Sequence, residues 1–120
     1  MRFQEKEAEV LDHQNALIWM KQVKTGLTFD EAQAYALQVA RETGQPWRLP
    51  TIDELGSLID RSRCNPASGF PDMLAIAFWS SSPYVGNPNG AWSVVFSNGN
   101  VSYYSRDYSL AVRLVRDNYV

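Results

Sequence analysis

The residues best suited to chemistry lie together in the stretch Pro46–Leu55, which reads PWRLPTIDEL. Arg48 is followed closely by two acids, Asp53 and Glu54. General acid–base catalysis needs titratable groups that face one substrate. Asp53 and Glu54 are consecutive, so on a helix their side chains would not face each other. We therefore expect these acids to have a structural role. Arg48 is open to two interpretations, an ion pair with a carboxylate or hydrogen bonds to backbone carbonyls.

The spacing of Thr51 and Glu54 supplies that structural role. In a Thr-x-x-Glu capping box the threonine side chain accepts a hydrogen bond from the glutamate amide, and the glutamate side chain accepts one from the threonine amide. The same spacing recurs at Thr28 and Glu31. Each box predicts the start of a helix, where the helix dipole favours negative charge.

Apolar periodicity extends both predicted helices. After Thr28, apolar residues recur at helical spacing as far as Gly44, which suits the left-handed residue at a helix end. We therefore predict an amphipathic helix over residues 29–43. A second helix follows Thr51. Its buried stripe comprises Ile52, Leu55, Leu58 and Ile59.

Nucleophiles and metal ligands are scarce in this sequence. The chain has one cysteine, Cys64, and one histidine, His13. No disulfide can form within the chain, and a zinc site needs more ligands than these two residues provide. We expect Cys64 to be a partly buried small residue and His13 to be solvated in a turn. No cofactor or metal is predicted.

Length and charge limit the class of protein. The chain has 120 residues and a formal net charge of -2, which indicates one domain over residues 1–120 and argues against nucleic acid as a partner. The longest apolar run, Met73–Trp79, is too short to cross a bilayer. The opening MRFQEKEAEV holds no apolar signal segment. We therefore expect a soluble domain without membrane insertion, and its compartment stays open.

Strand patterns occupy both ends of the chain. AEVL and ALIWM flank the turn-forming DHQN, and AIAFWSSS, AWSVVF and VSYYS follow the helices. Asn98 and Gly99 lie between the last two runs and are typical of a hairpin turn. Residues 110–116, LAVRLVR, indicate one last strand with Val112 on one face and Arg113 on the other. This order predicts an α+β fold with two helices packed on small antiparallel sheets.

Several strings of the sequence resemble one bacterial domain family. The motifs are WRLPTIDELGSLID with a following NP, then FWSSS, AWSVVFSNGNV and the closing VRLVR, and ALIWM and TFDEAQAYA match the opening strand and first helix. The family is named for the C-terminal domain of the Legionella collagen-like adhesin, and the resemblance covers nearly the whole chain. It makes PWRLPTIDEL a fold signature, with Trp47 and Leu49 in the core and Pro50 and Thr51 before the second helix.

The resemblance implies a C-type-lectin-like fold, related to formylglycine-generating enzymes and to variable proteins diversified by retroelements. Members of the family are mostly surface or secreted binding modules. Leu114 stands where members often carry a cysteine, and the cysteines of the enzyme branch are absent. Calcium-binding lectins of this fold carry carboxylate-containing triplets, whereas residues 87–89 read Asn-Pro-Asn. We therefore expect no calcium in the usual lectin position and no catalysis.

A binding surface is predicted in the C-terminal half. Residues 73–105 contain no Asp, Glu, Lys or Arg, and residues 79–109 are rich in the Tyr, Ser and Asn that recognition loops use. Trp79, Trp92 and Tyr103 are expected to lie in the core. The opposite strand face and the preceding loop would form the binding patch, or else an ordinary polar sheet face. These residues are Tyr84, Asn87, Asn89, Ser102, Tyr104, Arg106 and Tyr108.

The leading functional hypothesis is a non-catalytic recognition module that binds a glycan or a protein through this patch. The alternative is a structural or oligomerising head domain of a surface or fibre protein, which would form a homo-oligomer. A retroelement-diversified protein is less favoured, although randomised asparagine codons yield the residue types found here. An enzyme is also less favoured, because the two acids near Arg48 have capping roles.

Overall fold

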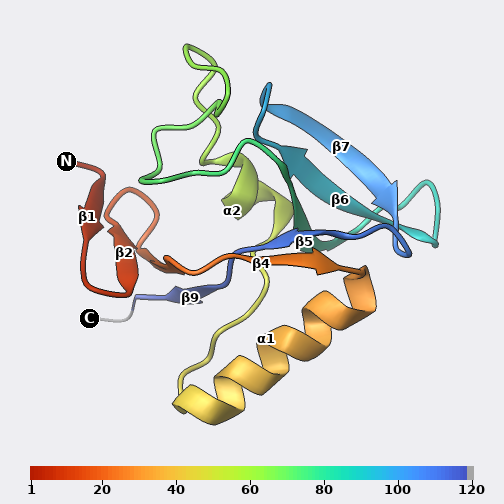
Figure 1. Cartoon of the computed structure of the whole chain (residues 1–120), viewed down its shortest axis with the longest axis horizontal. Coiled ribbons are helices and arrows are strands. Elements are labelled where there is room, and N and C mark those ends of the chain that lie inside the picture. The colour runs from red at the N-terminus through yellow and green to blue at the C-terminus, as the bar shows by residue number, and fades with distance from the viewer. Residues whose placement is uncertain (119–120) are drawn as a thin grey trace.

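Two β-sheets and two helices make up the protein, and the computed structural model describes residues 1–118. The first sheet has the strand order β1-β2-β3-β9, and the second has the order β4-β8-β5-β6-β7. The predicted α+β class with two helices is therefore confirmed (Figure 1). The C-type-lectin-like assignment stays a prediction, with which this architecture is compatible. The elements are β1 (Phe3–Glu5), β2 (Glu9–Asp12), β3 (Leu17–Met20), β4 (Lys24–Leu27), α1 (Phe29–Thr43), α2 (Ile52–Gly56), β5 (Ala77–Pro83), β6 (Gly90–Val95), β7 (Asn100–Ser105), β8 (Leu110–Val112) and β9 (Val115–Asp117).

The predicted hairpin near the start of the chain is confirmed as β2 and β3, which pair antiparallel. The turn between them contains His13, which is exposed as expected and contacts Gln4 through its ring at 2.8 Å. Strands β1 and β4 were not predicted, because each is short and lacks a regular apolar alternation. Strand β9 pairs antiparallel with β3, so the first and last strands belong to one sheet and lie on the same side of the molecule (Figure 1).

The carboxylate of Asp12 joins the first sheet to the segment before it. Its two oxygens accept hydrogen bonds from Arg2 Nε at 3.0 Å and Arg2 Nη2 at 3.1 Å, and Trp19 Nε1 donates to it at 3.3 Å. Asp12 is 1% exposed. Burial by itself raises the pKa of this carboxyl, but the hydrogen bonds and the charge of Arg2 outweigh burial and lower the pKa below its ordinary 3.8.

The single strand predicted over residues 110–116 is wrong. Strand β8 pairs with β4 and β5 in the second sheet, and β9 pairs with β3 in the first. The strand breaks at Arg113 and Leu114, where the chain passes from the second sheet to the first and both side chains are buried. Arg113 Nη1 donates to the carbonyls of Met20 and Lys21 at 2.9 and 2.8 Å. Its guanidinium also lies 4.5 Å from the ring centroid of Phe70.

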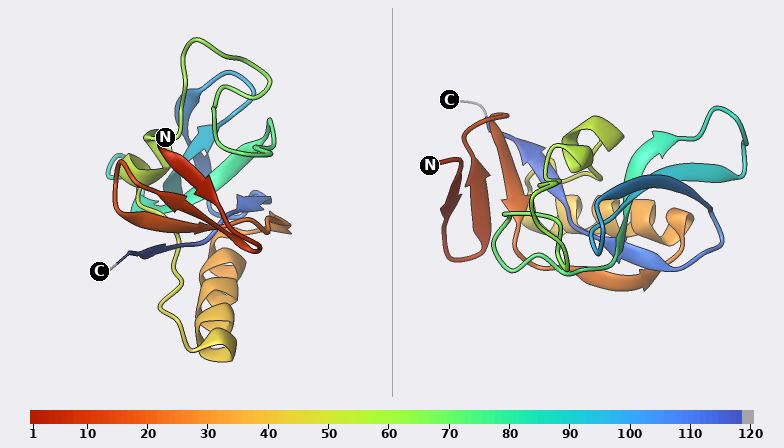
Figure 2. Two further views of the ribbon diagram at one scale, coloured as in Figure 1. Left: turned by 90° about the vertical axis from the view of Figure 1, so that its left-hand side faces the viewer. Right: turned by 90° about the horizontal axis from the view of Figure 1, so that it is seen from above.

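Helix α1 has the predicted boundaries. The capping box of Thr28 and Glu31 is formed in both directions, and Gly44 ends the helix with φ 70°. The helix packs along one side of the second sheet, as two views show (Figure 1 and Figure 2). Phe29 meets Trp79 edge to face, with ring centroids 5.5 Å apart. The expected burial of Trp79 is thus confirmed, since its exposed fraction is 0%.

Helix α2 is shorter than the predicted stripe suggests. Its capping box is confirmed, but regular helix ends at Gly56, and Leu58 continues only as a turn whose amide donates to the Leu55 carbonyl. Leu55 and Leu58 are nevertheless buried, while Ile52 and Ile59 are partly buried against the same core. Apolar spacing therefore predicted the buried residues correctly and the helix length incorrectly.

The segment before α2 is confirmed as architecture. Trp47 and Leu49 are 6% and 5% exposed, and both belong to the core on the α1 side of the second sheet. Arg48 between them exchanges both backbone hydrogen bonds with Val115, each at 2.9 Å. The expectation for Cys64 is wrong, because this side chain is exposed in the long loop before β5. Residues 61–65 of that loop are all exposed, so this part of the loop is not covered by another segment.

We predict that Asp12→Asn lowers the free energy of unfolding by about 2 kcal/mol at neutral pH, since charged hydrogen bonds are lost in a buried site. The folded pKa of Asp12 lies below its ordinary 3.8, so its contribution is complete above that value and is lost as the pH falls through the folded pKa. Urea unfolding at several pH values measures this. Two curves that stay equally far apart below pH 4 would contradict the assignment.

Candidate functional site

Of the two acids in the PWRLPTIDEL stretch, Glu54 is engaged in an ion pair and in its capping box, whereas Asp53 is exposed. Arg48 donates to Glu54 through both terminal nitrogens, at 2.7 and 2.9 Å, and also to Asp117 at 3.2 Å. Glu54 Oε1 accepts in addition from the Thr51 amide at 2.9 Å. Burial raises the pKa of Glu54, but the hydrogen bonds from Arg48 and Thr51 outweigh it and lower the pKa. Both interpretations of Arg48 hold, because Nη1 also lies 3.4 Å from the Leu49 carbonyl.

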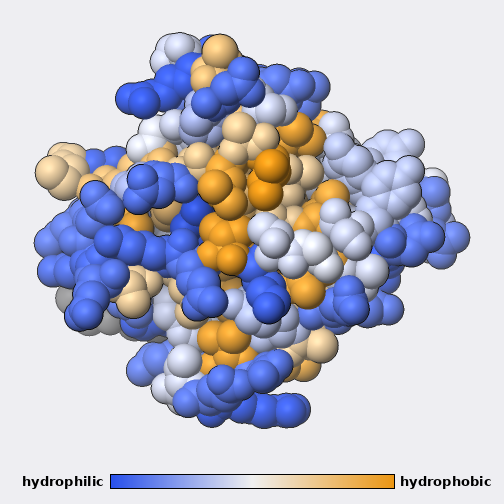
Figure 3. Space-filling model, in the orientation of Figure 1, coloured by the Kyte–Doolittle hydropathy of each residue, from blue (hydrophilic) through white to orange (hydrophobic). Residues whose placement is uncertain are grey.

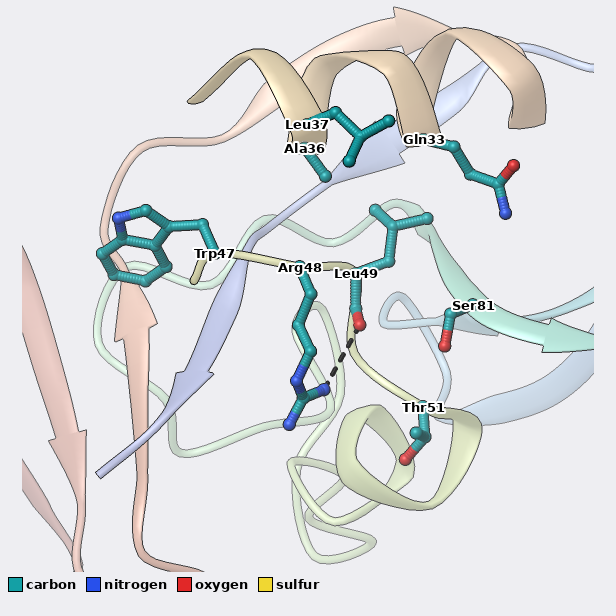
Figure 4. Close-up of a pocket in the computed structure, with 8 residues that line it drawn as sticks. All are labelled: Gln33, Ala36, Leu37, Trp47, Arg48, Leu49, Thr51 and Ser81. Atoms are coloured by element: carbon teal, nitrogen blue, oxygen red, sulfur yellow. Dashed lines mark hydrogen bonds between the residues drawn. The ribbon is translucent and has the colours of Figure 1, made fainter. Parts of the chain in front are cut away.

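A groove of about 530 Å³ runs between α1 and this stretch (Figure 4). Apolar side chains form most of its wall, and the guanidinium of Arg48 points toward its lower end (Figure 4). Because Arg48 is already paired with two carboxylates, its charge is compensated within the protein. The groove therefore offers apolar surface and few free polar groups. Its lining comprises Gln33, Ala36, Leu37, Trp47, Arg48, Leu49, Thr51 and Ser81.

The predicted binding patch falls on the hairpin of β6 and β7 and on the loops around it. The hairpin is confirmed, with Val95 opposite Asn100 and a turn that ends at Gly99, where φ is 81°. However, the strand is not continuous through residue 108. Strand β7 ends at Ser105, and a turn closed by the Tyr108 amide on the Ser105 carbonyl follows it. The predicted residues are consequently divided between two faces.

One face carries a cluster of three aromatic rings, which we call the aromatic cluster: Tyr84, Trp92 and Tyr103. The rings of Tyr84 and Tyr103 are stacked, with centroids 3.9 Å apart and planes 5° from parallel. Trp92 meets Tyr84 edge to face at 4.9 Å and Tyr103 at 6.3 Å. A hollow of about 330 Å³ lies against these rings, and Val101 and Ser102 complete its lining.

The expectation that Tyr103 lies in the core is wrong. Tyr103 is 49% exposed, and Trp92, also expected in the core, is only half-buried. The reason is how far the core extends along the hairpin. Trp92 and Tyr103 share a sheet face with Val94, which is buried in the first core, but they lie farther from the turn, where this core no longer covers the hairpin. Counting outward from the Asn-Gly turn already pairs Trp92 with Tyr103, but this pairing does not say whether the core covers the two rings.

The other face holds the rest of the predicted patch near the start of α1. Tyr104 is partly buried against the second core, and its ring lies 5.6 Å from that of Tyr108, which is 55% exposed. Arg106 lies over the Phe29 ring at 4.7 Å. Its guanidinium is thus used within the fold.

The two predicted asparagines shape the loop before β6. Asn87 Oδ1 accepts from the Asn89 amide at 3.0 Å, and the Asn89 carbonyl accepts from the Arg106 amide at 2.8 Å. Both residues are exposed. Of the seven predicted residues, the structure therefore places only Tyr84 in the aromatic cluster. Ser102 also lines the hollow beside the rings, and the others lie on the loop or the opposite face.

Two further observations bear on partners. Within residues 1–118, no three or more His, Cys, Asp or Glu side chains come together in a group that could hold a metal ion. In the same range, neither helix has the length and apolar character needed to cross a bilayer. Figure 3 shows apolar side chains in the middle of one face, with hydrophilic side chains on both sides of them. The absence of calcium stays a prediction.

The position of the Tyr84 ring generates a test. A Cβ added at Gly86 would lie 2.7 Å from Tyr84 Cε2, so Gly86→Ala must displace that ring. Because Gly86 is exposed in a loop, we expect a loss of about 1 kcal/mol or less in unfolding free energy, with a clear change in near-ultraviolet circular dichroism. Gly56→Ala, where no atom lies within 4 Å, is the control. An unchanged spectrum in Gly86→Ala would show that the stacked pair does not form in solution.

Comparison with known proteins adds one finding. A family model described as the Lcl C-terminal domain matches residues 8–116, nearly the whole chain. No curated protein matches the chain. The matched range includes both helices, the buried WRLP segment and the complete β6–β7 hairpin.

Proposed function

We propose that this chain, which belongs to the Lcl C-terminal domain family, is a non-catalytic recognition module. The aromatic cluster is the centre of its proposed binding site. Family membership indicates a surface-associated domain. The finer proposal is that Tyr84, Trp92 and Tyr103 bind a glycan or a protein ligand. The C-type-lectin-like fold is part of the same proposal.

The observation that supports this site is the exposure of a ring that is already fixed in place. One face of Tyr103 is covered by Tyr84 at 3.9 Å, yet Tyr103 remains 49% exposed. Its exposure must therefore come from the other face and the edges of the ring. A tyrosine held by its neighbours loses little conformational entropy when a ligand covers it. Such a ring is a suitable platform for the apolar face of a sugar or for a protein side chain.

The electrostatic surroundings favour an uncharged contact. The lining of the hollow beside the rings comprises Tyr84, Trp92, Val101, Ser102 and Tyr103, none of which carries a charge at neutral pH. A ligand can approach without stripping water from a charged side chain, which would cost free energy. The tyrosine hydroxyls supply hydrogen bonds for orientation.

The acids and the histidine give little support to catalysis. Glu54 and Asp12 each accept several hydrogen bonds inside the fold, and both have lowered pKa values for that reason. A general base near neutral pH needs the opposite shift. His13 is exposed and contacts Gln4. We therefore propose binding in preference to an enzymatic role.

The proposal is tested by a matched pair of tyrosine variants. A glycan array that includes sulfated polysaccharides, run with and without a calcium chelator, first identifies a ligand, and protein capture follows if the array is empty. We expect Tyr103→Ala to weaken binding about tenfold or more, since a stacked ring contributes about 1–3 kcal/mol. Tyr108→Ala, which removes an equally exposed tyrosine from the opposite face, should leave affinity unchanged.

The reverse result would support the other face. Loss of binding in Tyr108→Ala with retention in Tyr103→Ala would move the site to Tyr104 and Tyr108, as the sequence first suggested. Circular dichroism of both variants separates lost binding from lost folding. Binding that survives both substitutions would contradict a site on the hairpin.

A further inference from the structure

Strand β7 leaves an unprotected sheet edge. It is the last strand of the second sheet, and among the described residues no strand pairs with its outer side. Figure 1 shows it at the upper margin of the molecule, away from α1. Its six residues, NVSYYS, include no charge and no proline, and all six pair with β6 without a bulge. Natural proteins commonly protect long edge strands with charged residues, prolines or bulges, because an open edge can pair with another strand. Strand β7 has none of these.

The other edge strands of the described chain are protected. Strand β1 has three residues and ends at the acidic Glu5. Strand β4 carries Lys24, a left-handed Gly26 and a shift in register against β8. Strand β9 is short, includes Arg116 and is covered by the backbone of Arg48. The lack of protection is therefore specific to β7.

The backbone groups that face outward from β7 follow from its pairing with β6. The Arg106 amide donates to the Asn89 carbonyl at 2.8 Å, and this bond flanks the pair of Gly90 and Ser105. In an antiparallel ladder, hydrogen-bonded pairs alternate with non-hydrogen-bonded pairs. Gly90 and Ser105 therefore form a non-hydrogen-bonded pair, and the N–H and C=O of Ser105 point away from β6. The alternation continues along the strand. The amides and carbonyls of Tyr103 and Val101 therefore also point outward.

One of these outward groups is already used. The Ser105 carbonyl accepts from the Tyr108 amide at 3.0 Å. Ser102 alternates inward, in agreement with the hydrogen bond that its carbonyl accepts from Ser93 Oγ at 3.3 Å. Val101 and Tyr103 are thus the two residues of β7 with both an amide and a carbonyl available at the edge.

The geometry points to a second copy of this chain as the partner: two β7 strands pair antiparallel across a two-fold axis at Ser102, with Val101 of each copy opposite Tyr103 of the other. Each of these pairs exchanges both of its N–H···O bonds, so the four available groups of each copy are all satisfied. A register centred on Tyr103 would instead require the Ser105 carbonyl, which is already bonded. The five-stranded second sheets of the two copies then form one continuous sheet.

The side chains are compatible with this register. Val101 and Tyr103 are 44% and 49% exposed, and the pairing brings them side by side as β-branched and aromatic neighbours, a favourable cross-strand combination. No like charges meet, because residues 73–105 are uncharged and Arg106 would lie opposite Asn98. The backbone bonds of the interface come from the edge of β7, while the Val101 and Tyr103 side chains also line the hollow beside the aromatic cluster.

The mass of the protein in solution tests the pairing. Analytical ultracentrifugation from micromolar to millimolar concentration should show a concentration-dependent shift from 13.6 kDa toward twice that mass. The double variant Val101→Lys with Tyr103→Lys places lysine opposite lysine in both pairs and should weaken association about tenfold or more. The matched variant Val101→Glu with Tyr103→Lys places glutamate opposite lysine and should restore it.

Hydrogen exchange supplies a readout that the substitutions do not disturb. In the natural chain the amides of Val101 and Tyr103 should become protected as concentration rises, whereas those of Ser102 and Tyr104, bonded to β6, should not change. A strict monomer at millimolar concentration overturns the proposal. So does a dimer that both double variants leave intact, or one that the Glu–Lys variant fails to restore. Circular dichroism confirms that each variant is folded.

Discussion

The rest of the structure depends on a constraint on residues 110–117, which must serve both sheets. Strand β8 adds to the second sheet and β9 to the first, so the chain crosses between the two at Arg113 and Leu114. The crossing is held by the Arg113 guanidinium, which donates to the carbonyls at the end of β3. Burial lowers the pKa of Arg113 to about 10, yet the group remains charged at neutral pH. Its hydrogen bonds to carbonyls and its place over the Phe70 ring offset part of the cost of burying that charge.

A second arginine extends this connection to the helices. Arg48 is bonded through its backbone to β9 and through its side chain to Glu54 in α2 and Asp117 in β9. The same glutamate caps its own helix through the Thr51 amide. The segment that a chemist would first suspect of reactivity therefore joins α2 to the first sheet. Its Glu54 is occupied, and the apolar residues on either side of Arg48 belong to the second core.

The β6–β7 hairpin lies at the far side of the sheet from this connection. Its inner face covers the second core through Ala91, while the Trp92 and Tyr103 rings face solvent. An edge that pairs with a second copy would place two aromatic clusters on one sheet. Two linked weak sites bind a repeating ligand more tightly than either one does alone, because the second contact becomes intramolecular. Recognition and assembly are then compatible on one small domain.

The sequence by itself determined the local features: both capping boxes, the limits of α1 and the Asn-Gly hairpin. These features depend on neighbours within a few residues, and side-chain types encode them directly. It also determined the lack of charge over residues 73–105.

Tertiary structure alone decided where each strand belongs. A period of two shows which residues share a face, but it does not say which face the core covers. It also does not say how far along a strand the core covers that face, so Tyr103 was expected to be buried although only Val94 on that face of the hairpin is. The break at Arg113 was missed for a related reason, since LAVRLVR is a regular strand pattern until its two halves pair with different sheets. The exposure of Cys64 and the open edge of β7 likewise depend on which segments pack beside them, and no local pattern in the chain encodes that.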